Sequence, residues 1–377
     1  MLEEDVLEPG DSDFEEINPS QFSEIVVFGT DWTTETIYSQ LKKGNIKLDP
    51  PFQRRIAWKE DRKSSFIESL IFGVPVPQII LNQVEGGKYI VLDGKQRLTT
   101  IEEFFSDQLC LKNLTLDSSL NGCSFKDFNI KYEGYYTELS NRPIRTTVIK
   151  NCKSEALLHQ IFLRVNTGSV KLSPQELRQA LHPGKFVSFA NEFTGKCEPL
   201  KKLLGISEPD YRMRDVDIFV RSMGFYFYGK EYSGNMRGFL DDTCKKLNKD
   251  WNSVENDCQE ASKDFSKSIE FVHDVFGENS FRVYSSNKYS RQVNRAVIDI
   301  MIHYFMKKEI RKKLTGCKSD IVKQYQKISS DQNFKKSVSF STNSSWSVDT
   351  RFSMWADCLN SLDDDVNLNS PLLNLQL

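Results

Sequence analysis

The spacing of apolar residues changes twice between residues 61 and 105, and this change constrains the fold more than any other feature of the chain. A helical spacing that ends before Gly73 is followed by two short strand-like runs and then by a second helical spacing. Glu85-Gly86-Gly87 separates the two runs and has the composition of a hairpin turn. In chain order the segments are 61–72, 78–82, 89–92 and 98–105. This order of helix, hairpin, tight turn and helix predicts a mixed α/β domain.

Weaker signals place further elements on either side of this unit. Residues 33–43 have helical spacing, with Thr33 or Thr34 as the N-cap and Gly44 as the stop signal. The pattern also predicts strands at 46–48 and 146–149 and a helix from about 154 to 165. Ser173-Pro174-Gln175-Glu176 is typical of a helix start, because Ser caps, Pro occupies the first turn and Glu completes a capping box.

Helical patterns dominate the chain after about residue 186, where strand signals nearly vanish. We expect helices in this half at 216–228, 236–248, 256–276, 290–313 and 319–329. The whole pattern divides the chain into an acidic flexible lead-in, a mixed domain, a helical domain and a flexible tail, over 1–24, 25–185, 186–362 and 363–377. The predicted fold class is α+β, with an all-helical second domain.

Composition excludes several classes of protein. The formal net charge of −2, from 50 basic and 52 acidic side chains, argues against a globally basic nucleic-acid-binding protein. The eight cysteines are widely spaced and form no Cys-x-x-Cys, which argues against a zinc ribbon or a disulfide framework. The acidic N-terminus and the lack of a long apolar run predict a cytoplasmic protein without a signal peptide or a membrane span.

The segment that indicates chemistry is Asp93-Gly94-Lys95-Gln96-Arg97, directly after the second strand-like run. Gly94 permits a tight turn, and the first turn of the helix that follows offers backbone N–H groups to an anion. Lys95 and Arg97 add positive charge, and an arginine can hold two phosphate oxygens at once. Asp93 suits a magnesium ion, and Gln96 suits a water molecule.

The same five residues also have a structural interpretation. Asp-Gly after a strand is a common turn, and lysine and arginine are usually solvated, so the pentapeptide alone favours a structural role. The spacing of a P-loop is missing.

Two other segments add residues suited to phosphates or bases. A loop with Pro50 and Pro51 carries Gln53 and Arg54 next to aromatic residues, which suits stacking and phosphate contact. Arg164 and Asn166 lie near the predicted end of a helix, just before Gly168. The alternative for both segments is structural: a domain-edge loop with its aromatics in the core, and an ordinary helix C-cap.

The order of these motifs resembles that of a known family. The matching segments are Phe52-Gln53-Arg54, Val74-Pro75-Val76-Pro77, Leu92 to Thr100, Phe162 to Gly168 and Leu172 to Arg178. Over about residues 25–185 the chain resembles the N-terminal domain of GmrSD-type, type IV restriction enzymes, which itself resembles the ParB nuclease-like fold. The residue between Gly and Gln is commonly Gln in that family and is Lys95 here, which bears on nucleotide preference.

The resemblance implies nucleotide binding and hydrolysis with Mg²⁺ at the Asp-Gly-x-Gln-Arg motif, coupled to action on modified or invading DNA in anti-phage defence. The catalytic candidates are Asp93, Gln96 and Arg97, with Asp93 also the metal ligand. The nucleotide-binding candidates are Gln53, Arg54, Gly94, Lys95, Thr99, Arg164 and Asn166. Expected partners beyond the nucleotide are DNA, a separate nuclease or defence-system protein, and a second copy of the chain, with no membrane.

Two alternatives stay open beside a nucleoside triphosphatase. The first is a non-hydrolysing, nucleotide-gated DNA clamp or adaptor. The second is a metal-dependent DNA nuclease, although the four histidines are isolated and do not form the cluster of an HNH nuclease. In the helical half, Asp217 and Arg221 have the i,i+4 spacing of an ion pair on a helix surface.

Overall fold

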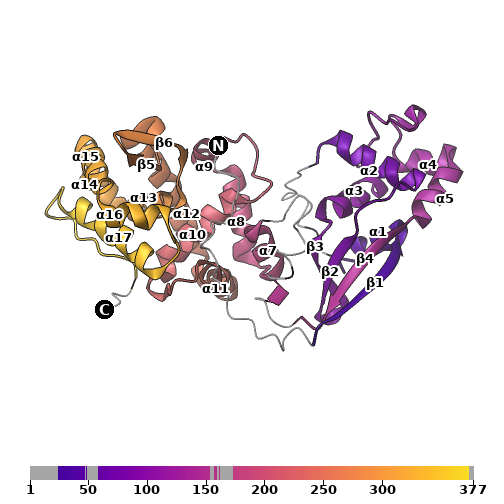
Figure 1. The fold of residues 1–377 in the computed structure, drawn as a ribbon, viewed down its shortest axis with the longest axis horizontal. Coiled ribbons are helices and arrows are strands. Elements are labelled where there is room, and N and C mark those ends of the chain that lie inside the picture. Colours follow the sequence, from indigo (N-terminus) through magenta and orange to yellow (C-terminus); the bar gives the residue numbers. More distant parts are fainter. Residues whose placement is uncertain are drawn as a thin grey trace. The chain divides into compact units, whose positions relative to one another are not determined.

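The computed structural model describes residues 24–46, 48, 58–152, 157, 158, 161 and 173–372 (Figure 1). Within these ranges the chain forms two compact units, which meet in sequence between Leu181 and His182. The first unit is mixed α/β and the second is almost entirely helical, which confirms the predicted fold class. In the described part of the chain, no helix is both long and apolar enough to cross a membrane.

A four-stranded sheet organises the α/β unit. Its strand order is β1-β4-β2-β3, formed by Val26–Thr33, Pro143–Lys150, Ile79–Val84 and Lys88–Asp93. β2 and β3 form the predicted hairpin, whose turn contains Gly86 and Gly87 with positive φ angles. β4 pairs antiparallel with β1 and parallel with β2, with Ile79 opposite Thr146. β1 has no counterpart among the sequence-based predictions, because seven of its eight residues are polar or exposed.

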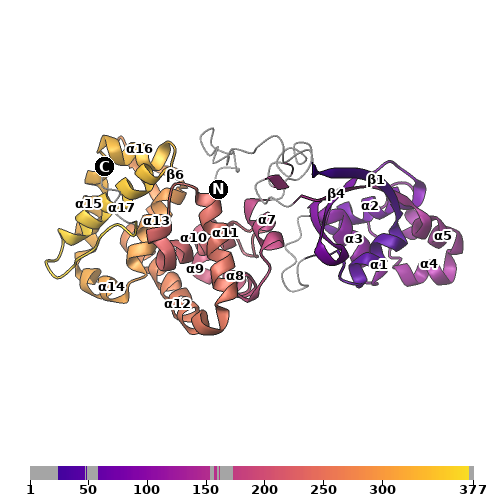
Figure 2. The same cartoon turned by 90° about the horizontal axis from the view of Figure 1, so that it is seen from below.

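Most helices of this unit lie on one face of the sheet (Figures 1 and 2), and one contacts the other face. They are α1 (Thr34–Lys42), α2 (Glu60–Phe72), α3 (Lys95–Phe105), α4 (Phe125–Lys131), α5 (Glu133–Asn141) and α7 (Pro174–Leu181). Ile79 and Leu81 belong to a large core with α1, α2 and α3, whereas Ile80 belongs to a small core with Leu177 of α7. This alternation along β2 follows from the two-residue period of a strand. It brings α7 to the face opposite α3.

Local signals in the sequence set most of the helix ends. Thr33 caps α1 by accepting a hydrogen bond from the Thr36 N–H, and Gly73 ends α2 in the left-handed conformation. Ser173 and Glu176 form the predicted capping box of α7. The predicted helix over 154–165 lies mostly outside the described residues.

The second unit contains helices packed around one large core (Figures 1 and 2). They are α8 (Lys185–Lys196), α9 (Glu198–Leu204), α10 (Arg214–Tyr228), α11 (Met236–Lys249), α12 (Trp251–Phe276), α13 (Arg295–Phe305), α14 (Lys308–Leu314), α15 (Lys318–Ile328), α16 (Gln332–Ser339) and α17 (Ser345–Asn360). The predicted helix over 290–313 is wrong at its start. A hairpin of β5 (Arg282–Ser285) and β6 (Lys288–Val293) stands there instead.

The hairpin forms because its turn residues favour it. Ser286 and Asn287 adopt positive φ angles, and serine and asparagine compete with helical backbone hydrogen bonds. Asn294 then caps α13 by accepting a hydrogen bond from the Val297 N–H, so the helix starts five residues later than the apolar pattern suggested.

Two other predictions for the helical unit also differ from the structure. Arg221 does not lie at the surface: it is buried and makes a two-point contact with Asp299 at 2.6 and 2.7 Å. The flexible tail predicted from residue 363 instead buries Val366 and Leu368 in the helical core. Isolated apolar residues in a polar segment give no periodic signal, so the sequence pattern did not reveal this contact.

Candidate functional site

The turn between β3 and α3 gathers six of the predicted site residues. β3 ends at Asp93, Gly94 takes a φ of +99°, and α3 begins at Lys95. A Cβ atom on Gly94 would lie 3.1 Å from Ile79 Cγ1 and 3.3 Å from Arg97 Nη2. The turn therefore requires glycine both for its φ angle and for the close approach of these neighbours.

Asp93 and Arg97 close this turn as a buried ion pair. Asp93 Oδ1 accepts from the Gly94 N–H at 2.8 Å, and Asp93 Oδ2 accepts from Arg97 Nη2 at 2.9 Å. The same nitrogen donates to the Gln78 carbonyl oxygen at 2.8 Å. The side chains are only 7% exposed for Arg97 and 15% for Asp93. Arg97 is thus fixed by protein acceptors on both sides of the turn.

Lys95 reaches in a different direction, towards α7. Its Nζ lies 3.5 Å from Glu176 Oε1, and both side chains are largely buried. The other oxygen of Glu176 accepts from the Ser173 N–H at 2.7 Å in the capping box. Glu176 therefore joins the 93–97 turn to the start of α7.

Gln96 and the residues after it tie the first turn of α3 to its surroundings. Gln96 Oε1 accepts from the Trp58 N–H at 3.4 Å, and the Gln96 carbonyl oxygen accepts from Thr100 Oγ1 at 2.8 Å. Thr99 is buried at 5% exposure. The Arg62 guanidinium lies 4.7 Å from the centre of the Trp58 ring, so an aromatic and a cation border this side of the site.

The electrostatics of this helix start favour an anion. The first hydrogen bond of the helix runs from the Leu98 N–H to the Gly94 carbonyl oxygen, so the amides before Leu98 have no acceptor within the helix. The first turn of α3 contains no acidic residue, whereas α1, α2, α4, α5 and α7 each have at least one there. Lys95 and Arg97 lie where the helix dipole is already positive, and in the free protein Glu176 and Asp93 balance their charges.

A magnesium ion delivered with phosphates fits Asp93 as one ligand. The carboxylate of Asp93 lies at the turn itself, where its two oxygens accept the hydrogen bonds described above, and carboxylate oxygen is a ligand type that Mg²⁺ prefers. Mg²⁺ in phosphate sites commonly takes one or two carboxylates and completes its shell with phosphate and water. Among the described residues, no group of three or more His, Cys, Asp or Glu side chains is placed to hold a metal by itself.

Some predicted site residues cannot be placed, and others were missed. Gln53, Arg54, Arg164 and Asn166 lie outside the described residues. The sequence interpretation missed two contacts. Glu176 pairs with Lys95, and the Gln78 carbonyl oxygen accepts a hydrogen bond from Arg97. Ser173-Pro174-Gln175-Glu176 was visible as a helix start, but only the fold shows that this start faces Lys95.

Residues 34–183 match the model of a protein family described as "GmrSD restriction endonuclease, N-terminal domain". This segment is a GmrSD N-terminal domain. The match runs from the first residue of α1 to just beyond α7, so the GmrSD N-terminal domain includes both the 93–97 turn and Glu176. It indicates a restriction-related function of the type IV class. A comparison with curated proteins found no match.

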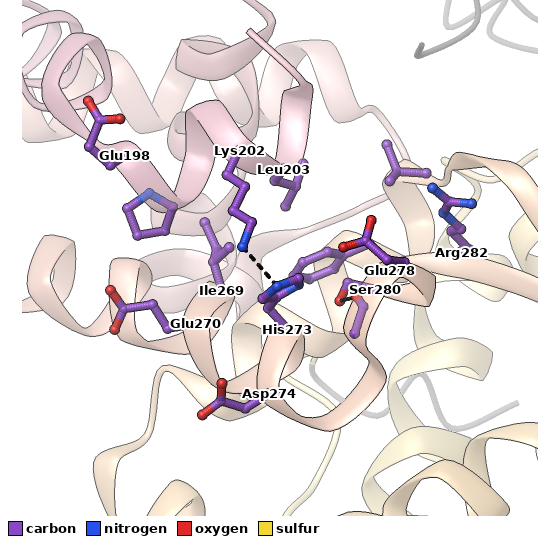
Figure 3. A pocket seen from close by; sticks show the side chains of 14 residues that line it. Glu198, Lys202, Leu203, Ile269, Glu270, His273, Asp274, Glu278, Ser280 and Arg282 are labelled. Carbon is purple, nitrogen blue, oxygen red and sulfur yellow. Dashed lines mark hydrogen bonds between the residues drawn. The ribbon is translucent and has the colours of Figure 1, made fainter. Parts of the chain in front are cut away.

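The helical unit, outside the GmrSD N-terminal domain, has a pocket of about 470 Å³ between α9, α12 and the start of β5 (Figure 3). Lys202 Nζ and His273 Nε2 are 2.9 Å apart across it, and Glu278 and Arg282 line the same space. Its charged side chains have both signs, so they favour neither an anion nor a cation.

Proposed function

We propose that the GmrSD N-terminal domain binds a nucleoside triphosphate with Mg²⁺ at the 93–97 turn and hydrolyses it, as part of a restriction-related protein. The observation that carries this proposal is the start of α3: a left-handed Gly94, uncapped first-turn amides and an added lysine, beside the carboxylate of Asp93. Helix starts of this kind bind phosphates in many unrelated proteins.

In this proposal the phosphates lie against the Gly94 backbone and the Lys95 ammonium group. Asp93 holds the magnesium ion, which neutralises phosphate charge, and Gln96 orients the attacking water. Arg97 acts through Asp93, because its guanidinium already binds Asp93 and the Gln78 carbonyl. The remaining residues suggested by the family resemblance, Gln53, Arg54, Thr99, Arg164 and Asn166, would complete the pocket wall.

The helical unit would couple this nucleotide chemistry to a partner. DNA and a separate nuclease or defence-system protein are the partners that a restriction-related function suggests. Turnover that rises on addition of DNA would support the first of these partners.

The test is phosphate release by the full chain with each of the four ribonucleoside triphosphates and Mg²⁺, with and without DNA. Lys95→Ala is the decisive variant, because Lys95 adds charge without closing the turn, whereas loss of Arg97 also breaks the ion pair with Asp93. Lys196→Ala is the matched control, since Lys196 makes an exposed ion pair with Glu192 in the helical unit.

We expect turnover in the wild type and the control, and a loss of about a hundredfold in Lys95→Ala, the order expected when one charge-stabilising group is removed from a phosphate site. Binding without turnover in the wild type would favour the clamp or adaptor. Absence of both binding and turnover with every triphosphate would overturn the proposal.

A further inference from the structure

Both cations of the 93–97 turn are paired with carboxylates, but the two pairs differ in geometry. Arg97 donates to Asp93 over 2.9 Å and has a second acceptor in the Gln78 carbonyl. Lys95 lies 3.5 Å from Glu176, which is beyond the usual length of a charge-assisted hydrogen bond. The pair of Lys95 and Glu176 is therefore the looser of the two.

Glu176 belongs to a different element from the turn and occupies the third position of α7. Its Oε2 atom keeps the capping-box bond with the Ser173 N–H, while its Oε1 atom faces Lys95. The side chain of Glu176 is only 8% exposed, so water screens its charge weakly. A phosphate that approaches Lys95 would thus meet the negative charge of Glu176 close to the lysine ammonium group.

We infer that Glu176 is a positioning residue that competes with the nucleotide phosphates for Lys95 and so sets the nucleotide affinity of the domain. In the free protein Glu176 neutralises Lys95. In the nucleotide complex Lys95 turns from Glu176 to a phosphate oxygen, and Glu176 keeps its capping role. This inference rests on the proposed function, because it names the regulation of the same site.

The position of α7 gives this exchange a route to the rest of the chain. α7 ends at Leu181, and the helical unit begins at His182. Within the helical unit, Asn248 Nδ2 donates to the His182 carbonyl oxygen at 2.9 Å, and Asn248 Oδ1 accepts from the Phe186 N–H at 3.0 Å. The residues that directly follow α7 are therefore hydrogen-bonded to α11. Because α7 continues into these residues, a movement of Glu176 and α7 would be passed on to them.

The test measures equilibrium binding of ATP, GTP, CTP and UTP with Mg²⁺ to the full chain. Four proteins form a cycle: wild type, Glu176→Gln, Lys95→Gln and the double variant. Glutamine keeps the capping box, since its side-chain oxygen accepts the same hydrogen bond. Glu192→Gln is the matched control, because Glu192 pairs with Lys196 at the surface of α8.

We expect Glu176→Gln to bind a triphosphate about tenfold more tightly than the wild type, the order of one charge-assisted interaction released from competition. The same substitution should change nothing when Lys95 is already glutamine. Binding by Glu176→Gln where the wild type binds too weakly to measure would support the inference as well.

Three results would overturn it. Equal or weaker binding by Glu176→Gln, with clear binding by the wild type, would show that Glu176 does not compete with the nucleotide for Lys95. The proposed function would stand. If Glu176→Gln changes nucleotide affinity equally in the wild type and in Lys95→Gln, Glu176 acts on the structure of the domain and not on Lys95. If neither the wild type nor Glu176→Gln binds any triphosphate, the proposed function fails and the inference fails with it.

Discussion

Replacing Arg97 with methionine tests whether the ion pair with Asp93 holds the turn together. Methionine retains the length and much of the volume of the arginine side chain, so the main loss is polar. Arg97→Met removes the hydrogen bonds to Asp93 Oδ2 and to the Gln78 carbonyl, so the Asp93 carboxylate, which is 15% exposed, loses the guanidinium that it contacts at 2.9 Å. Asp93 would keep the Gly94 N–H as a donor.

The magnitude follows from these contacts. Removing one partner of a fully buried ion pair costs about 3–5 kcal/mol. Because Asp93 is partly exposed and retains one donor, we expect the lower end, a loss of about 3 kcal/mol in the free energy of unfolding of the α/β unit. For a unit of this size the loss corresponds to a fall of about 9 °C in its melting temperature.

Urea unfolding followed by tryptophan fluorescence and circular dichroism measures the change, with Trp32 and Trp58 in the α/β unit. The double variant of Asp93→Asn and Arg97→Met should cost clearly less than the sum of the single variants, because it removes both charges of this ion pair together. A loss below about 1 kcal/mol in Arg97→Met, or strict additivity in the double variant, would refute the idea that the ion pair of Arg97 with Asp93 holds the turn together.

Two further predictions concern the helical unit. Asp299→Asn leaves Arg221 and Arg351 buried without their shared carboxylate, so it should lower the free energy of unfolding in urea by about 4 kcal/mol. Asp264→Asn, at the more exposed pair with Arg311, should lower it by about 1 kcal/mol, and equal losses would contradict the argument. Burial lowers the pKa of His303 to about 3, so its native form stays neutral while the unfolded form takes up a proton below about pH 6.5. Stability should therefore be constant above that pH and fall by about 2 kcal/mol between pH 6.5 and 5, and His303→Gln should remove this slope in pH-dependent unfolding.

Features that depend on neighbouring residues were predictable from the sequence. The Gly94 turn, the left-handed end of α2 at Gly73 and the capping box at Ser173 each depend on residues a few positions apart, and the structure confirms them. The hairpin of β2 and β3 was predictable for the same reason, since Gly86 and Gly87 supply the positive φ angles of its turn.

Features that depend on distant residues were not predictable. Arg221 could be paired with Asp217 from spacing alone, but the fold places Asp299, 78 positions away, within 2.6 Å. The contact of Lys95 with Glu176 depends on α7 crossing to the second face of the sheet, which a one-dimensional pattern does not encode. β1 was missed because it lies at the sheet edge with both faces largely exposed, so it lacks the alternation that marks a strand.

The structure also separates two cations that the sequence pattern treats alike. Arg97 is held by two protein acceptors and shapes the turn, whereas Lys95 has a longer contact to a carboxylate on another helix. A long ion pair exchanges its partner at lower cost than a short one with good hydrogen-bond geometry. Lys95 also stands where the family commonly has glutamine, a residue with no charge to neutralise. Under the proposed function, the lysine would add affinity for phosphate and Glu176 would limit it, so the two residues would act as one adjustable unit beside a fixed turn.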